Sequence, residues 1–194
     1  METKVRFAPS PTGYLHIGGL RTALYNYLYA KKVGGKILLR IEDTDQTRKV
    51  DHAVENLIST FKRLNIQFDE RKKDDEGNRF FFQSKRLKIY KQHIKVLLKT
   101  GNAYPCFCSL ERLENVREKQ TKNKNPIKYD RHCLKLDSKQ VNKKMISESH
   151  IIRMKVPSNK EVVFYDMVRD KVTFNSDVID DQVLIKSDGY PTYH

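Results

Sequence analysis

The first forty-five residues contain two short apolar runs separated by an amphipathic segment. Residues 5–8 are mostly apolar, and Pro9 and Pro11 end this run because proline cannot donate to a sheet ladder. Apolar residues then recur at helical spacing between about residues 18 and 32. Residues 37–41 form a second apolar run, which is typical of a parallel strand covered on both faces. The order predicts a right-handed strand–helix–strand crossover with a ligand site at the carboxyl ends of its strands.

Residues that could bind a ligand follow both predicted strands. His16, Gly18 and Gly19 lie at the start of the predicted helix, where free N–H groups and the helix dipole favour a phosphate. Ser10 follows the first strand, and the segment 42–45, which has three acidic residues and Thr44, follows the second. An anion-binding loop beside carboxylates suits a nucleotide together with an amine-bearing substrate. The segment contains neither G-x-G-x-x-G nor a Walker A sequence, so neither a dinucleotide fold nor a P-loop is indicated.

The remaining chain divides into a helical part and a strand-rich part. Apolar spacing predicts a helix from about Asp51 to Leu64 and another that Ser84 caps, and a short strand or a buried plug lies between them at residues 80–82. After residue 103 come three cysteines, a basic stretch over 117–128 without apolar periodicity, and alternating segments that predict strands at 152–156, 162–164 and 172–174. The apolar residues 183–185 predict a return to the parallel sheet.

Composition narrows the class of protein. The chain has 194 residues and a net charge of +14, which favours encounter with nucleic acid, although a general abundance of lysine would give the same charge. No apolar run approaches the roughly twenty residues of a membrane helix, and the first strand begins too early for a signal peptide. We therefore expect a soluble cytoplasmic protein without a membrane partner; a processed organellar form would look the same.

Two segments resemble one known family. Residues 6–18, read as Arg-Phe-Ala-Pro-Ser-Pro-Thr-Gly-x-Leu-His-Ile-Gly, and residues 40–45, Arg-Ile-Glu-Asp-Thr-Asp, resemble the start of the glutamyl-tRNA synthetases. Residues 16–19 are similar to the HIGH signature of class I aminoacyl-tRNA synthetases, with Gly19 in place of its last histidine. Residues 187–194, Ser-Asp-Gly-Tyr-Pro-Thr-Tyr-His, resemble a later segment of the same family.

The resemblance implies an α/β fold, namely a Rossmann-like class I catalytic domain with an inserted α+β connective subdomain. Residues 1–102 would form the first half of the catalytic domain, residues 103–180 the inserted subdomain that binds the tRNA acceptor, and residues 181–194 the return to the catalytic sheet. The family continues into a KMSKS loop and an anticodon-binding domain, neither of which is found in residues 1–194. We therefore expect these residues alone to bind substrates weakly and to activate nothing.

The resemblance also implies an activity and roles for single residues. The activity is glutamate–tRNA ligation, in which L-glutamate and ATP, assisted by Mg²⁺, form glutamyl-adenylate, and the glutamyl group is transferred to the 3′ end of tRNA(Glu); the full-length enzyme would be a monomer. Glutamate would contact Arg6, Ala8, Ser10, Glu42 and Tyr193; ATP would contact Thr12, His16, Gly18 and Gly19, of which the last three would be catalytic; and Asp45 would touch the tRNA. The structural alternatives are an Arg6–Glu42 ion pair between strand ends, a helix-capping His16 and a Tyr193 that only packs in the core.

Three cysteines suggest a metal site. Cys106, Cys108 and Cys133 cannot form an even disulfide framework, which leaves buried thiols or Zn²⁺. Some glutamyl-tRNA synthetases carry a Cys-x-Cys plus Cys-x-His zinc site, but Lys135 occupies the place of that histidine. Tyr129 with Cys133 matches the Tyr-x3-Cys variant of a related enzyme, and the adjacent His132 is a further candidate ligand.

Two other functions remain open from the sequence. The related enzyme glutamylates a modified base of tRNA(Asp), and it shares the first motif. The chain would alternatively serve as a tRNA-binding module without activity. The sequence does not determine whether a tRNA for glutamine is also charged.

Overall fold

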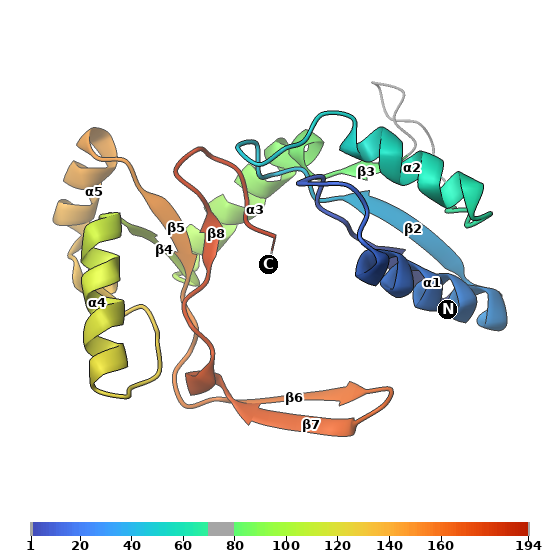
Figure 1. Cartoon of the computed structure of the whole chain (residues 1–194). Helices are drawn as coiled ribbons and strands as arrows, with labels where there is room; N and C mark the ends of the chain where they lie inside the picture. Colours follow the sequence, from blue (N-terminus) through green and yellow to red (C-terminus); the bar gives the residue numbers. More distant parts are fainter. Residues whose placement is uncertain (1, 70–79, 194) are drawn as a thin grey trace. The chain divides into compact units, whose positions relative to one another are not determined.

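The computed structural model describes residues 2–69 and 80–193. His194, the last residue of the segment 187–194 that resembles the family, lies outside the described residues. The chain divides into two compact units, one of residues up to Leu87 together with Tyr193, the other of Lys88–Thr192 (Figure 1). Within the described residues, no helix is long and apolar enough to cross a membrane.

The first unit contains the predicted strand–helix–strand crossover. Its strands form a three-stranded parallel sheet in the order β1-β2-β3, in which Arg6 pairs with Leu38 and Arg40 with Phe81. The prediction of a parallel crossover is therefore confirmed. The elements are β1 (Lys4–Phe7), α1 (Ile17–Val33), β2 (Lys36–Ile41), α2 (Ala53–Arg63), β3 (Phe81–Phe82) and the 3-10 turn η1 (Ser84–Arg86).

One face of this sheet carries the core of the first unit. Strand alternation places Phe7, Leu39 and Ile41 on that face, where they pack with Ala23 of α1 and with Leu57 and Phe61 of α2. The ring of Phe61 meets that of Phe7 edge-on, with the ring centroids 5.6 Å apart. The same alternation places Arg6, Leu38 and Arg40 on the opposite face, where none of them is fully buried. The first unit therefore has one apolar face and one face that carries charged groups.

The second unit mixes helices with antiparallel strands. One sheet has the order β4-β5-β8 and a separate hairpin pairs β6 with β7 (Figure 1). The elements are α3 (Leu87–Lys99), β4 (Ala103–Cys106), α4 (Leu110–Lys122), η2 (His132–Lys135), α5 (Ser138–Ser147), β5 (Ile151–Met154), β6 (Glu161–Asp166), β7 (Asp170–Asn175), η3 (Ser176–Val178) and β8 (Val183–Ile185). The boundaries at 102 and 180 for an inserted subdomain stay a prediction.

Several local predictions differ from the structure. The apolar run 183–185, within the predicted return of residues 181–194 to the parallel sheet, forms β8 and pairs antiparallel with β5 instead. Half of the basic stretch 117–128 is helical, because α4 starts at an Ser109 cap that accepts from the Arg112 N–H and extends to Lys122. The helix predicted from about Asp51 to Leu64 is present as α2, but its N-cap residue is His52 instead of Asp51, and His52 makes no side-chain cap bond. Residues 183–185 are an apolar run of only three residues, which suits a parallel or an antiparallel sheet equally. The apolar pattern alone therefore could not predict the direction of pairing of β8.

A buried carboxylate joins the strands of the second unit. Asp181 is 1% exposed and accepts hydrogen bonds from the Tyr104 hydroxyl at 2.6 Å, the Val156 N–H at 3.0 Å and an Arg131 Nη2 at 2.8 Å. Arg153 donates to the Asp181 carbonyl at 2.9 Å. Burial, followed by the bond to Asp181, raises the pKa of Tyr104, so this hydroxyl stays protonated and donates. The paired charges and satisfied oxygens explain how an ionised carboxylate is tolerated in this core.

Gly35 is required where the chain returns from α1 to β2. A Cβ built at Gly35 would lie 2.5 Å from the Thr3 carbonyl oxygen, whereas one at Gly13 would meet nothing within 4 Å. That carbonyl accepts from the Lys36 N–H at 2.8 Å, so it cannot move without loss of the bond. We expect Gly35→Ala to lower the free energy of unfolding by about 1–3 kcal/mol and Gly13→Ala to change it little. Urea denaturation of the two variants measures the difference, and equal stabilities would contradict this packing.

Candidate active site and candidate metal centre

Hydrogen bonds hold the loop after β1 against the segment after β2. The Glu42 N–H donates to the Pro9 carbonyl at 2.9 Å, and the Ser10 hydroxyl donates to the Glu42 carbonyl at 3.1 Å. Further along, the Val50 N–H donates to the Pro11 carbonyl at 3.0 Å. The structure therefore brings the predicted Pro/Gly loop and acidic segment together at the carboxyl ends of β1 and β2, where a parallel sheet places its ligand site.

Glu42 supplies a buried carboxylate at this edge. The residue is 5% exposed and its Oε1 forms a short ion pair with the Arg40 Nε. Strand alternation explains the pair, because residues 40 and 42 project from the same face. Burial raises the pKa of Glu42, and the Arg40 guanidinium only partly opposes this rise. A second cation, such as a substrate ammonium, would therefore stabilise the ionised carboxylate further.

Arg6 does not form the ion pair with Glu42 that the sequence left open, because Glu42 is paired with Arg40. Arg6 is exposed and lies on the same face of the sheet as Arg40, while Ala8 is half-buried just beyond the end of β1. The face thus carries two arginines and one buried carboxylate. Sequence reasoning missed Arg40, although its i, i+2 spacing from Glu42 was a usable signal.

His16 caps the first turn of α1. Its Nδ1 accepts the Gly18 N–H at 3.1 Å, and the side chain is exposed. Because Nδ1 acts as an acceptor, the proton of the neutral ring lies on Nε2, which is then a donor toward solvent. A Cβ at Gly19 would approach Leu15 Cδ1 to 3.1 Å, so the glycine also permits close packing of the loop. The capping role expected as an alternative is present, and it leaves a donor available to a ligand.

Two acidic residues after β2 form hydrogen bonds and an ion pair with other residues of the first unit. Asp43 accepts from the Ser84 N–H at 2.8 Å and from its hydroxyl at 2.5 Å, so Ser84 donates to Asp43 rather than capping the next helix. Asp45 pairs with Arg48, with Nη2 and Oδ2 2.6 Å apart. Hydrogen bonds from Thr47 and then Arg48 lower the pKa of Asp45 to about 2. Thr12 and Tyr193 are exposed, and their predicted roles stay predictions.

The second unit brings the predicted metal-binding residues together. The Sγ atoms of Cys106, Cys108 and Cys133 all lie within 4.8 Å of one another. The Tyr129 hydroxyl lies 3.2 Å from Cys106 Sγ and 3.3 Å from Cys108 Sγ. His132 does not belong to this group of donor atoms, and no other group of three or more His, Cys, Asp or Glu donors occurs in the described part of the chain. We call these three thiols with Tyr129 the thiol–tyrosine cluster.

The donor set of this cluster fits a structural zinc ion. A tetrahedral site with Zn–S bonds of roughly 2.3 Å needs four donors in close mutual contact, mostly thiolate. The Phe107 N–H also donates to Cys133 Sγ at 3.3 Å. Burial raises the pKa of Cys106, but the hydrogen bonds of its sulfur with the Tyr129 hydroxyl and the Cys108 backbone outweigh burial, so the pKa is lowered. Burial raises the pKa of Cys108 to about 11, so without a metal the thiols do not all ionise together.

Arg40 should control the pH dependence of stability through Glu42. Because the pKa of Glu42 in the folded protein lies above its ordinary value of 4.5, the folded state binds this proton more tightly than the unfolded state does. The free energy of unfolding therefore falls as the pH rises from 4.5 through the folded pKa. We expect Arg40→Met to lower the free energy of unfolding, relative to the unmodified protein, by about 1–3 kcal/mol at pH 8. Below pH 4.5, where the carboxyl is protonated, we expect little difference. Urea denaturation across this range measures the effect. Adding Glu42→Gln should remove most of it, and Lys36→Met, whose ion pair with Glu2 is exposed, serves as the control.

The chain matches the family model for the catalytic domain of class I tRNA synthetases (E and Q) over residues 2–194. It is 51% identical to a glutamate–tRNA ligase from Finegoldia magna and 50% identical to one from Alkaliphilus metalliredigens; the matches cover all of this chain but 42% and 41% of those proteins. The crystal structure of a glutamate tRNA ligase from Elizabethkingia meningosepticum in complex with its amino acid superposes with a TM-score of 0.87 at 36% identity, covering all of this chain and 40% of that one. The chain therefore spans about two fifths of the length of these relatives. With the parallel crossover and the loop that ends at His16 in place, the chain belongs to the class I tRNA synthetases for glutamate and glutamine.

Proposed function

We propose that the chain forms part of a glutamate–tRNA ligase, which activates L-glutamate with ATP and transfers it to the 3′ end of tRNA(Glu). The observation that carries this proposal is the buried Glu42 carboxylate at the carboxyl end of β2, beside the loop that ends at His16. The names of relatives that match the whole chain support the same activity. We propose a monomeric, cytoplasmic full-length enzyme.

The charged face of the first unit suits an acidic amino acid. The raised pKa of Glu42 means that an added cation is favourable there, and the ammonium of the amino acid supplies one. Arg6 presents a planar guanidinium from the same face of the sheet, which can pair with the side-chain carboxylate of glutamate in a bidentate manner. Ala8, Ser10 and Tyr193 would complete the amino-acid pocket. The pocket would thus distinguish glutamate from glutamine by charge.

The start of α1 suits the nucleotide. The His16 Nε2 donor and the N–H groups of the first turn favour phosphate oxygens, and the helix dipole adds to this attraction. Gly18, Gly19 and Thr12 would lie against the ATP. Mg²⁺ would be held mainly by the triphosphate, because Asp43 is already bound by Ser84 and Asp45 by Arg48.

These residues would act by alignment. In the first step, the α-carboxylate of glutamate attacks the α-phosphorus of ATP, the bond to pyrophosphate breaks, and glutamyl-adenylate forms. In the second, a hydroxyl of the terminal ribose of tRNA attacks the activated carbonyl and AMP leaves. Arg6 and Glu42 fix the amino acid, and His16 and the helix start stabilise phosphate charge in the transition state. Asp45 would meet the tRNA end.

We also propose that the thiol–tyrosine cluster holds Zn²⁺, with Cys106, Cys108, Cys133 and Tyr129 as its four ligands. The mutual distances support this, as does the location of all four donors within a single compact unit. The ion would be structural, since four protein donors leave no open position. It would hold α4 and the segment before η2 in the subdomain that is proposed to bind the tRNA acceptor.

Arg6 provides the sharpest test of the amino-acid site. Arg6→Ala should abolish the preference for glutamate over glutamine, because only the charged side chain needs the guanidinium. Lys4→Ala changes another exposed cation of β1 that projects from the same face, and it should leave the preference intact. NMR titration of residues 1–194 measures weak binding, and ATP–pyrophosphate exchange measures activation in a longer chain that contains them. Unchanged preference in Arg6→Ala would contradict the proposed site.

Product analysis separates the proposed ligase from the two alternatives. A ligase esterifies the 3′ end of tRNA(Glu), whereas the base-glutamylating relative labels a base of tRNA(Asp). A tRNA-binding module would bind tRNA in a salt-dependent manner without any effect of glutamate or ATP. Full pyrophosphate exchange by residues 1–194 alone would contradict our expectation that these residues activate nothing.

Zinc content tests the metal site separately. We expect about one zinc per chain by mass spectrometry, loss of zinc in Cys108→Ser, and weakened zinc binding in Tyr129→Phe, because the phenyl ring offers no donor. Tyr165→Phe alters a tyrosine that is 79% exposed on β6 and should have no effect. Purified protein that contains no zinc and takes up none would overturn this part of the proposal.

A further inference from the structure

Helix α4 begins directly after one pair of cluster residues and leads back to the other pair. Cys106 and Cys108 precede the helix, and Tyr129 and Cys133 follow it. Both ends of α4 are hydrogen-bonded to the segment that follows the helix, residues 128–130. Near its end, the Gln120 amide accepts from the Lys128 N–H at 3.1 Å and donates to the Lys128 carbonyl at 2.8 Å.

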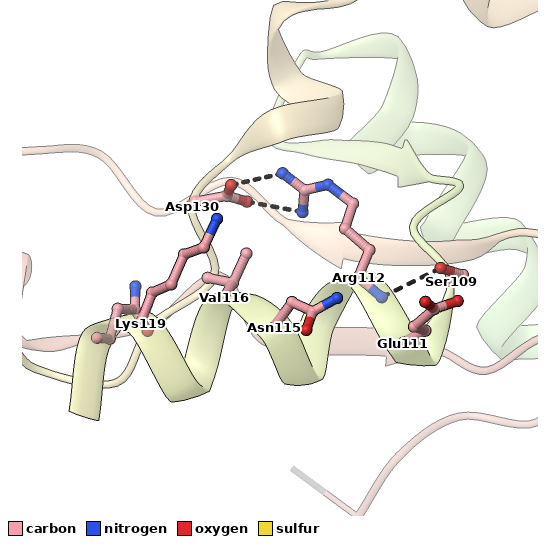
Figure 2. A pocket seen from close by; sticks show the side chains of 8 residues that line it. Ser109, Glu111, Arg112, Asn115, Val116, Lys119 and Asp130 are labelled. Carbon is pink, nitrogen blue, oxygen red and sulfur yellow. Dashed lines mark hydrogen bonds and ion pairs between the residues drawn. The ribbon is translucent and has the colours of Figure 1, made fainter. Parts of the chain in front are cut away.

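Arg112, in the first turn of α4, makes the contact at the other end. Its Nη1 and Nη2 donate to the two carboxylate oxygens of Asp130 at 3.2 and 2.6 Å (Figure 2). The same Nη1 also lies 3.5 Å from Cys108 Sγ. The guanidinium therefore links a sulfur of the cluster to a carboxylate that is adjacent to Tyr129. Asn115, Val116 and Lys119 line the open hollow of about 660 Å³ beside this pair.

The geometry distinguishes Arg112 from an ordinary surface ion pair. An ion pair whose side chains are 30% and 35% exposed contributes little to stability by itself. A rigid guanidinium that binds both a carboxylate and a sulfur fixes the position of that sulfur. Groups that hold a ligand from outside the coordination sphere commonly change metal affinity by about 10–100-fold.

We propose that Arg112, held by Asp130, is a positioning residue of the thiol–tyrosine cluster: it orients Cys108 Sγ for the metal and connects the first turn of α4 to it. This inference rests on the proposed zinc site and goes beyond it, since it assigns a function to a residue that is not a ligand. The Gln120–Lys128 contact closes the same loop without touching a sulfur, so its removal provides a comparison for loss of structure alone.

The experiment compares zinc affinity and cobalt spectra of the full chain. Competition with a chromophoric chelator should show about 10–100-fold weaker zinc binding in Arg112→Gln and a change in the same direction in Asp130→Asn. Arg112→Lys keeps the positive charge but lacks the planar guanidinium that binds the carboxylate and the sulfur together. Its zinc affinity should therefore lie between that of Arg112→Gln and that of the wild type. With Co²⁺ bound, the thiolate-to-cobalt absorption should shift in Arg112→Gln, because one sulfur is no longer fixed.

Two matched controls separate positioning from folding. Arg117→Gln removes an exposed arginine of the same helix, and Gln120→Ala removes the clamp at its other end; both should keep the cobalt spectrum and bind zinc within about threefold of the wild type. Circular dichroism verifies the helix content of each variant. Zinc affinity and a cobalt spectrum unchanged in Arg112→Gln would overturn the proposal while leaving the metal site intact. Equal losses in Arg112→Gln and Gln120→Ala would also overturn it, and a wild-type protein that binds no zinc would overturn both.

Discussion

The candidate active site depends on the burial of one carboxylate at the end of a parallel strand. An ionised Glu42 at 5% exposure is tolerable only with a cation beside it, and Arg40 supplies that cation from the same face of β2. The arrangement also fixes the backbone, since the Glu42 N–H and carbonyl bind Pro9 and Ser10 in the facing loop. The carboxylate, its partner and the loop therefore form one structural unit.

This unit orders the rest of the site through strand alternation. The buried side chains Phe7, Leu39 and Ile41 of β1 and β2 face the two helices, so the intervening positions, Arg6 and Arg40 among them, project from the opposite face. The loop after β1 then begins α1 at His16. Core packing on one side of the sheet and charged chemistry on the other thus arise from a single period-two pattern.

The sequence predicted the first unit better than the second for identifiable reasons. Proline and glycine mark the ends of β1 and α1, and the apolar spacing between them has one interpretation, so the parallel crossover is confirmed. Residues 183–185 carry no such marker, and their antiparallel partner in β5 depends on long-range pairing. Likewise, α4 continues into a basic segment without apolar spacing because its Ser109 cap and helix-favouring residues suffice.

Contacts between side chains were the least predictable features. The Cys-x-Cys spacing predicted that the thiols would meet, yet it could not show that Tyr129 and not His132 would complete the group. The pairing of Arg40 with Glu42, and of Ser84 with Asp43, likewise depends on which rotamers the fold permits. The roles of Arg6, Thr12 and Tyr193 remain proposals.

The position of the thiol–tyrosine cluster has a consequence for how this region can vary. Cys108 and Cys133 are 25 positions apart, and their sulfur atoms lie 3.5 Å from each other. The cluster therefore closes a loop of the chain between these two residues, and this loop contains all of α4. The entropy lost on closing a flexible loop grows only with the logarithm of its length, and doubling the length costs about 0.6 kcal/mol. Insertions or deletions in residues 123–127, which lie outside α4 and outside both of its contacts with the following segment, should therefore be tolerated far more readily than any change in the spacing of Cys106 and Cys108.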